Sequence, residues 1–426
     1  MISIGGTLTA FFLVVYLLSR QKSLGTAMLI GAGIIGFTAA EDITVNIFNI
    51  LPTFFQGVID PMTIQLVALV SLVTIFAYMM KEMSMLRDLI DVATYYLNSI
   101  FLSLVTIPSL IGVLPIPGGA IFSAPMIEPL GEKMELSGAE ITSLNIFFRH
   151  LWYFSFPYIP SIILASSLSG INILTIAAMH LPIVVMMILI GWVYYGKVGI
   201  GRKRLAEKSS AEVGAAGASG GSESSREKPG RRMVLNATLP YLIVLLPPIL
   251  LGIDFVISLF VGIVVVAFSK RDNFSPGMIK EGFNLELTYG VFGIMIFRAF
   301  IDNSEGVENL TELFLEAGLS PLLLALVVPF LVGLLTGNHV GAIGISYPVV
   351  LSVFSGSQAY SIWHMVIFSS SYFGYIVSPF HMCNIMTVEY FDTNFKKYYK
   401  NIALPLGSSA AGIVLLGLVY WFWLGG

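Results

Sequence analysis

Two short glycine-containing segments interrupt long apolar stretches and are the residues best suited to bind a ligand. The first lies at 115–119 inside the apolar region 99–130, and the second at 336–341 inside 320–355. Glycine lets the backbone approach a ligand closely, and an interrupted helix presents free N–H groups at the positive end of its dipole. Two such tips meeting within a membrane would hold an anion on N–H groups and Na⁺ on carbonyl or hydroxyl oxygens. The candidate binding residues are Gly118, Gly119, Ser123, Gly337, Asn338, His339, Gly341 and Ser346.

Two long apolar spans, 142–168 and 360–383, are interrupted by proline and polar residues. A proline removes one helical hydrogen bond and clashes with the preceding turn, so closely spaced prolines favour an unwound segment. Unwound backbone here would complete a site opposite each tip. The candidates are Pro157, Pro160, Ser161, Ser378, Pro379, His381 and Asn384.

Each feature also has a purely structural interpretation. The tip glycines would then serve close helix packing. Asn338 and His339 would satisfy the backbone of their own turn, and the prolines would only kink their spans.

Composition excludes an ordinary soluble enzyme. The chain has 426 residues, of which 56% are hydrophobic and 11% charged, and its mean hydropathy is +0.86. Soluble domains carry roughly 25% charged residues. The net charge of −3 indicates no nucleic-acid partner, and one cysteine, Cys383, excludes both a disulfide framework and a cysteine-based metal cluster. The sequence therefore predicts an all-α polytopic membrane protein.

Hydropathy predicts ten spans and two re-entrant hairpins. Regions 99–130 and 320–355 are expected to enter and leave on one side, because their breaks would leave unpaired backbone groups in lipid. With the N-terminus outside, the inside loops hold 20 of the 22 Lys and Arg residues, and Arg149 falls in the inner third of its span. This positive-inside bias places both termini outside the cytoplasm of a cell (inner or plasma) membrane. The spans are 2–18, 24–40, 62–80, 142–168, 171–195, 236–251, 253–269, 287–301, 360–383 and 401–423.

Residues 200–232 are rich in Lys, Arg, Glu, Ser, Gly and Ala, and such a segment predicts a flexible cytoplasmic linker. It divides the chain into a first repeat, 1–199, and a second, 233–426. Four short matches recur in the same order at offsets of 219 to 223, and an amphipathic stretch precedes each hairpin, at 81–99 and 302–320. Five spans per half would turn the second copy upside-down in the membrane. Inverted-topology repeats with discontinuous helices are typical of secondary transporters.

The motifs that the sequence lacks argue against several classes of function. No predicted span carries a carboxylate near its centre, which favours coupling to Na⁺ through neutral oxygens over coupling to H⁺. No HExxH, GxSxG or P-loop motif is present, so we expect no enzyme. We also expect no cofactor, and no metal beyond a transported Na⁺.

The two halves, each with an amphipathic helix, a hairpin and a broken span, resemble the ion-transporter superfamily of secondary carriers. Residues 116–125 and 337–346 resemble an uncharacterised prokaryotic branch of it, a domain of unknown function. The resemblance implies carriage of small anions by Na⁺ or H⁺ symport with an elevator-like motion, commonly in homodimers. The Ser-Asn-Thr tip motifs of the dicarboxylate carriers are absent here.

The sequence therefore predicts an ion-coupled secondary transporter of a small anionic solute, whose partners are that solute, a coupling cation and the lipid bilayer. A passive anion channel is the alternative, and a membrane protein without transport function comes third.

Overall fold

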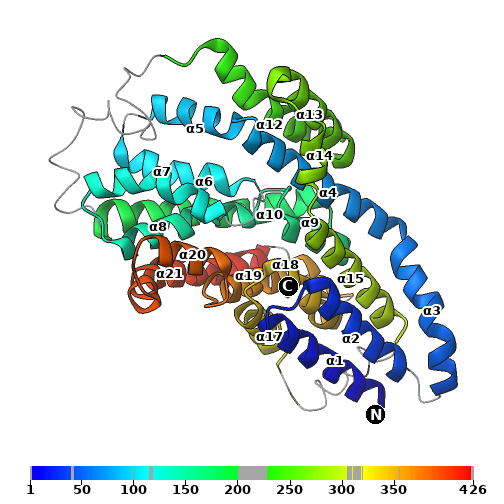
Figure 1. Ribbon diagram of the computed structural model, residues 1–426. Helices are drawn as coiled ribbons and strands as arrows, with labels where there is room; N and C mark the ends of the chain where they lie inside the picture. The colour runs from blue at the N-terminus through cyan, green and yellow to red at the C-terminus, as the bar shows by residue number, and fades with distance from the viewer. Residues whose placement is uncertain are drawn as a thin grey trace.

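A computed structural model shows an all-helical chain (Figure 1). It describes residues 2–39, 43–97, 99–114, 119–199, 228–304, 309, 318, 320–354 and 356–423. Within these ranges there are α-helices, short 3₁₀ segments and one π-helical turn, and no strand. The prediction of an all-α protein is therefore confirmed.

The described part of the first half contains ten α-helices. They are α1 (Ile2–Ser19), α2 (Leu24–Thr38), α3 (Ile43–Ile59), α4 (Pro61–Glu82), α5 (Met85–Tyr96), α6 (Ile100–Gly112), α7 (Gly119–Lys133), α8 (Gly138–Arg149), α9 (Pro160–Ser169) and α10 (Ile173–Gly191). The 3₁₀ turn η1 (Leu151–Tyr153) lies between α8 and α9, and the π-helical η2 (Trp192–Gly199) follows α10.

The described part of the second half contains nine α-helices. They are α12 (Arg231–Leu251), α13 (Phe255–Ser269), α14 (Gly277–Gly282), α15 (Leu285–Asp302), α17 (Pro321–Thr336), α18 (His339–Val350), α19 (Tyr360–Ile376), α20 (Met382–Tyr390) and α21 (Phe395–Trp423). The 3₁₀ turns η4 (Arg271–Asn273) and η5 (Leu351–Phe354) follow α13 and α18.

Local sequence signals explain where several helices begin. The side chain of Asp60 accepts a hydrogen bond from the backbone N–H of Met62, and Pro61 occupies the first turn of α4. Ser137 and Glu140 form a reciprocal capping box at the start of α8. These polar caps satisfy N–H groups that would otherwise be unpaired within or beside an apolar phase.

Four helices in the described residues are long and apolar enough to cross a membrane: Pro61–Glu82, Ile173–Gly196, Arg231–Leu251 and Phe395–Phe422. Eight further apolar helices have 10–17 residues. These observations agree with a membrane protein. One stretch predicted as a loop differs, because 43–59 forms the apolar helix α3.

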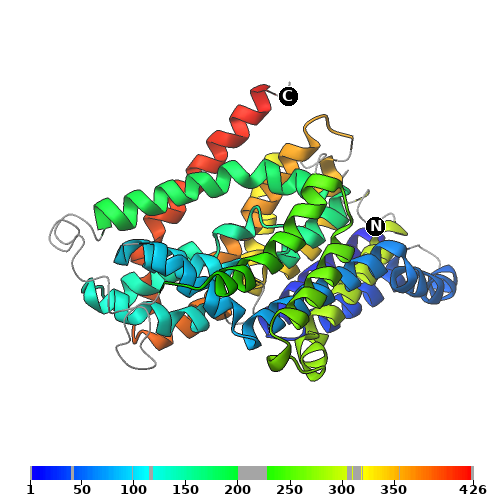
Figure 2. The same ribbon diagram turned by 90° about the horizontal axis from the view of Figure 1, so that it is seen from above.

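The helices form two bundles that lie side by side (Figures 1 and 2). The support bundle contains α1–α4 and α12–α15. The hairpin bundle contains α6–α10 and α17–α21, and within it α21 packs along α10. The amphipathic helix α5, inside the predicted stretch 81–99, contacts α4, α6 and α12 and so connects the two bundles.

The two halves of the chain exchange packing partners. In the support bundle, α2 packs against α15, and its counterpart α13 packs against α4. In the hairpin bundle, α7 packs against α20, while α18 packs against α9. Each hairpin therefore rests on the second part of the broken span that belongs to the other half.

Helical interruptions are present in both regions predicted as hairpins and in both spans predicted to be broken. Helix α6 packs against α7, and α17 against α18. Helix α18 has 12 residues, so it extends about 18 Å and is too short to cross a hydrocarbon core of about 30 Å. The first broken span stops at Arg149 and resumes as α9 at Pro160, and the second stops at Ile376 and resumes at Met382.

Glycines join each hairpin to the broken span of its own half at matching positions. A Cβ atom at Gly112 would overlap the carbonyl oxygen of Arg149, and one at Gly333 would overlap the carbonyl oxygen of Ser371. The two pairs correspond at offsets of 221 and 222. The packing therefore aligns Arg149 with Ser371, a correspondence that the sequence matches did not contain.

Parts of two predictions lie outside the described residues. These are 200–227 of the predicted linker and most of the second amphipathic stretch, 302–320.

We expect Gly374→Ala to destabilise the fold. A Cβ at this position in α19 would overlap the carbonyl oxygen of Phe330 and lie 2.9 Å from the backbone nitrogen of Leu334. Because backbone cannot move aside locally, the loss should be about 1–3 kcal/mol, visible as a lower Tm in detergent. Gly407→Ala in α21 is the matched control, because its Cβ would meet nothing within 4 Å. Equal melting temperatures for the two variants would contradict this account of the glycine contact.

Candidate functional site

The first hairpin tip lies against a buried guanidinium. Gly119 is the first residue of α7, and Arg149 is the last residue of α8. A Cβ at Gly119 would overlap the terminal Nη2 of Arg149 and lie 2.7 Å from its Cζ. Glycine at this position therefore leaves room for the guanidinium, which occupies the space that a side chain would fill.

Arg149 is an unusual residue to find in this interior. Its side chain is 2% exposed, and it is the one charged side chain classed as buried among the described residues. No Asp or Glu in the described ranges is buried. A guanidinium with five fixed donors is suited to carboxylate or phosphate-like anions. The α7 N-terminus beside it adds further positive potential, so both features favour an anion.

The second tip is built differently. Gly337 ends α17 with a left-handed φ of 59°, and a Cβ there would lie 2.6 Å from the carbonyl carbon of Phe380. The side chain of Asn338 accepts a hydrogen bond from the N–H of Gly341 (3.0 Å) and so caps α18. The imidazole of His339 is buried, with Nε2 3.2 Å from the hydroxyl of Ser371.

Arg149 and Ser371 therefore occupy matching places in the two halves. The carbonyl oxygen of each residue lies against a glycine of the hairpin in the same half. The side chain of each residue contacts the tip of that hairpin. The side chains differ in charge. The first half of the site is thus cationic, whereas the second is neutral and polar.

A cluster of imidazole and phenol rings joins the two breaks. His150 lies 5.0 Å from His381 and 5.0 Å from Tyr153, measured between ring centroids. Tyr375 lies 4.1 Å from His381 and stacks on His339 at 5.5 Å. We call these five residues the central cluster. It comes from η1, α18, α19 and the starts and ends of both breaks, so it is the place where the second tip meets the two interruptions.

The remaining two histidines extend this line of rings. Phe368 lies 4.9 Å from His339 and 4.9 Å from His180, and His180 lies 5.7 Å from His364. All five histidines of the chain are therefore buried in the hairpin bundle and connected through ring contacts.

The structure brings some predicted site residues together. His339 and His381 belong to the central cluster, and Gly119 and Gly337 touch the adjoining broken spans. Ser123 donates a hydrogen bond to the side-chain oxygen of Asn145 (2.6 Å), and Asn145 donates to the carbonyl of Ala120 (3.0 Å). This buried Ser–Asn pair is a set of neutral oxygens one turn below the first tip.

Other predicted residues serve the breaks themselves. Asn384 donates to the carbonyls of Ile376 (2.8 Å) and Ser378 (3.1 Å) and accepts from the hydroxyl of Tyr398 (3.0 Å). Ser378 donates to the carbonyl of Leu334 (2.5 Å). These side chains satisfy carbonyl groups that the interruption of the helix releases.

The remaining predicted residues are placed as follows. The hydroxyls of Ser161 and Ser346 are buried with no hydrogen-bond partner among the described residues. Pro157 is buried in the first break and Pro160 begins α9, whereas Pro379 is exposed. Gly341 lies in the first turn of α18, where a Cβ would be 3.3 Å from Leu24, and Gly118 lies outside the described residues.

Sequence reasoning missed Arg149, Tyr153, Tyr375 and Cys383 as site residues. Arg149 did carry a signal, because an ionisable side chain within a span marks a functional site by default. Because Arg149 lies in the inner third of its predicted span, it was interpreted as part of the positive-inside bias instead. The tyrosines and the cysteine carried no such signal, because they become neighbours only through the fold.

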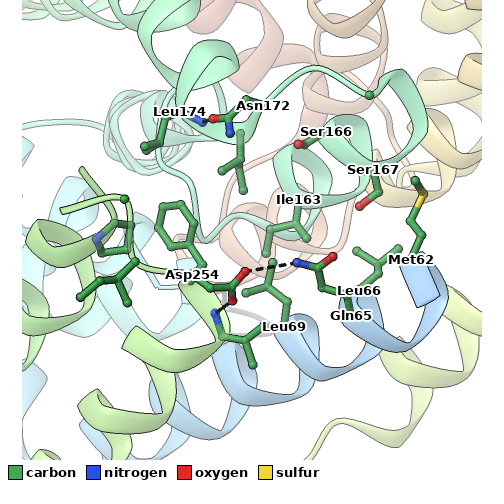
Figure 3. Close-up of a pocket in the computed structure, with 17 residues that line it drawn as sticks. Met62, Gln65, Leu66, Leu69, Ile163, Ser166, Ser167, Asn172, Leu174 and Asp254 are labelled. Atoms are coloured by element: carbon green, nitrogen blue, oxygen red, sulfur yellow. Dashed lines mark hydrogen bonds between the residues drawn. The ribbon is translucent and has the colours of Figure 1, made fainter. Parts of the chain in front are cut away.

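A cleft of about 380 Å³ lies between the two bundles (Figure 3). Its walls come from α4, α9 and the α12–α13 turn. Gln65 donates to Asp254 (3.3 Å) across one wall, and Ser166 and Ser167 of α9 line the other. Near the cleft, Arg298 pairs with Asp302 at 3.3 Å and contacts the carbonyl of Ser167 at 3.4 Å.

The family model described as "Protein of unknown function (DUF401)" matches residues 5–210 and 221–420. The chain belongs to this family. The match covers nearly all of both halves and leaves out 1–4, 211–220 and 421–426, of which 211–220 lie in the predicted linker. No curated protein matches the chain.

We expect Gly119→Ala to remove anion binding while leaving the fold intact. The new methyl group would meet the far end of a flexible side chain, so Arg149 can swing aside at little cost in stability. The guanidinium would then leave the tip. Gly341→Ala is the matched control, because its Cβ would lie 3.3 Å from the nearest atom, on the side chain of Leu24. Anion-induced shifts in Tm measure the effect. A Gly119→Ala protein that responds to anions as wild type does would remove Gly119 from the site.

Proposed function

We propose that this protein is an ion-coupled secondary active transporter of a small anionic solute, working by an elevator-like alternating-access mechanism in a cell membrane. Na⁺ is favoured over H⁺ as the coupling ion. The observation that carries the proposal is the Arg149 guanidinium, buried against the first residue of α7.

The electrostatics of this contact favour an anion. A guanidinium and a helix N-terminus both carry positive potential, so placing them together is unfavourable unless negative charge lies near. The described interior contains no buried carboxylate that could supply such charge permanently. A carried anion would supply it temporarily, which is the behaviour that a transport site requires.

The exchanged packing of the halves supports an inverted repeat. Two copies related by an axis in the membrane plane would each donate elements to the other, as α7 and α20, and α18 and α9, do here. Such two-fold symmetry allows one conformation to open inward, and the conformation in which the two repeats exchange roles to open outward, around a single site. Five spans per half, with hairpins that dip in from opposite faces, are part of this proposal.

The division into two bundles supports an elevator-like motion. The hairpin bundle holds both tips, both breaks and the central cluster, whereas the support bundle holds none of them. Because a cleft lies between α4 and α9, the two bundles are not in continuous contact along their shared face. Sliding of the hairpin bundle along the support bundle would carry the whole site across the membrane.

Neutral oxygens support Na⁺ as the coupling ion. Ser123 and Asn145 form one buried oxygen-rich pair, and Ser346 provides a buried hydroxyl at the equivalent place in the second hairpin. Hard cations bind such oxygens, and no acid in the described interior offers a proton carrier. Both termini would lie outside the cytoplasm, and a homodimer and membership of the ion-transporter superfamily remain part of the proposal.

We expect Arg149→Gln to abolish anion-dependent stabilisation and uptake. Loss of a hydrogen bond to a charged group costs about 1.5–3 kcal/mol, equivalent to roughly 10- to 100-fold in affinity. A thermal-shift screen of small anions identifies a binding solute, and counterflow of that labelled solute in proteoliposomes then measures exchange. Arg298→Gln is the matched control, because it removes the same charge from a residue paired with Asp302. A carrier exchanges faster when preloaded from the opposite side, so unchanged rates with and without preloading would favour a channel.

We expect Na⁺ to lower the anion concentration needed for half-maximal stabilisation, compared with choline at equal ionic strength. Asn145→Leu should remove this dependence, because it deletes the oxygen that accepts from Ser123. Ser409→Ala, which removes a buried hydroxyl in α21, serves as the control. Anion binding that is identical in Na⁺ and choline would exclude Na⁺ coupling at this site while leaving the role of Arg149 open.

A further inference from the structure

Three potential metal ligands meet where the two breaks approach each other. The ligand atoms of His150, His381 and Cys383 all lie within 4.8 Å of one another. His150 follows α8, His381 precedes α20, and Cys383 lies in the first turn of α20. All three residues are buried. The chain therefore places two imidazoles and a thiol from opposite halves around one point.

The hydrogen bonds orient one imidazole as a metal ligand. Nδ1 of His150 lies 2.7 Å from the carbonyl oxygen of Ile146, and a carbonyl only accepts, so Nδ1 carries the proton. Nε2 then holds the free lone pair. Its one hydrogen-bond contact is the hydroxyl of Tyr375, at a long 3.4 Å. A backbone carbonyl that fixes the tautomer of a histidine is the usual outer support of a metal-bound imidazole.

The second imidazole has unused capacity. Neither ring nitrogen of His381 makes a hydrogen bond of ordinary geometry to the described residues, although the residue is 2% exposed and a backbone group of Ile376 lies nearby. A buried polar group without a partner costs free energy, so natural interiors rarely keep one without a reason. A metal ion bound to one nitrogen would remove that cost. Simple ring packing against Tyr375 would not.

Charge at this point also fits a metal-bound thiolate. Cysteine binds metal as a thiolate, and Cys383 interacts electrostatically with Arg149. A thiolate would place one negative charge beside the buried guanidinium. It would also offset part of the repulsion between Arg149 and a divalent ion.

We propose that His150, His381 and Cys383 form a binding site for a borderline-soft divalent transition metal of the Zn²⁺ class. Nitrogen and sulfur ligands select such ions over Mg²⁺ and Ca²⁺, which require oxygen. Three protein ligands leave one position of a tetrahedral set for water or another small ligand. Because the ligands come from both breaks, the metal would fix the distance between the two halves at the level of the tips. The site is distinct from any Na⁺ site and does not depend on the proposed transport.

Cobalt spectroscopy tests the proposal on the intact protein. The full chain is purified in detergent with a chelator, freed of any purification tag, and titrated with Co²⁺. Tetrahedral Co²⁺ bound to a thiolate gives a near-ultraviolet charge-transfer band and intense visible d–d bands. Cys383 is the single cysteine of the chain, so such a band identifies its ligand without any substitution. We expect saturation at one Co²⁺ per chain and loss of the band when Zn²⁺ is added.

Variants then assign the nitrogen ligands. His381→Gln should weaken Co²⁺ binding at least about tenfold, because even outer-shell changes cost that much in known sites. His364→Gln is the matched control, since it removes another buried histidine of the same bundle outside the triad. Cys383→Ser should abolish the charge-transfer band, and Zn²⁺ should raise the Tm of wild type but not of this variant.

Two results would overturn the proposal. One is a wild-type protein that develops no thiolate band at saturating Co²⁺. The other is equal loss of binding in His381→Gln and His364→Gln, which would place the metal elsewhere or attribute the effect to general instability. If Cys383→Ser fails to fold, the wild-type spectrum and the two histidine variants still decide.

Discussion

Burial of one guanidinium is the constraint on which the rest of this structure depends. Arg149 has to be accommodated among apolar helices, and the chain achieves this by ending α8 beneath a hairpin that begins with glycine. Gly112 lets the backbone of the hairpin approach the Arg149 carbonyl, and Gly119 leaves room for the side chain. The glycines of the hairpin and the end of α8 therefore together accommodate the buried guanidinium of Arg149.

The second half makes the same contact between hairpin and broken span without a charged side chain. Gly333 abuts Ser371 as Gly112 abuts Arg149, but the side chain that reaches the tip is a hydroxyl. His339 and its stacked neighbour Tyr375 fill the space instead. A duplicated framework has thus kept its backbone contacts while its side chains diverged. This asymmetry places the positive potential on one side of the central cluster and the unpaired imidazole nitrogens on the other.

Much of the framework was predictable, because it follows from local rules. Glycine and proline mark where helices cannot continue, so both hairpins and both interruptions could be located from the sequence. The sequence could not predict which helices of the two halves pack against each other, because all the spans are similarly apolar. Within the site, His339 and His381 were identified as polar residues at breaks. Asn338 and Asn384 were identified by the same reasoning. Asn338 hydrogen-bonds to the backbone of its own turn, and Asn384 hydrogen-bonds to the backbone of the second break and to the hydroxyl of Tyr398.

The site residues that escaped prediction share one physical cause. His150 and Cys383 are separated by more than half of the chain, and nothing in their local sequence indicates that they meet. Arg149 was visible as a charge within a span, but its meaning depended on Gly119, thirty residues earlier, being in contact with it. Long-range neighbours decide the chemistry here, whereas short-range patterns decide only where the helices stop.

The confinement of every imidazole to one bundle has a practical consequence. Since no histidine lies on the surface, a spectrum of protein labelled only in its histidine rings would contain signals from the hairpin bundle alone. Five resonances, spread along a line from the breaks to His364, would act as internal reporters of tautomer and hydration. The interior of this protein can therefore be observed selectively, without attaching any probe to it.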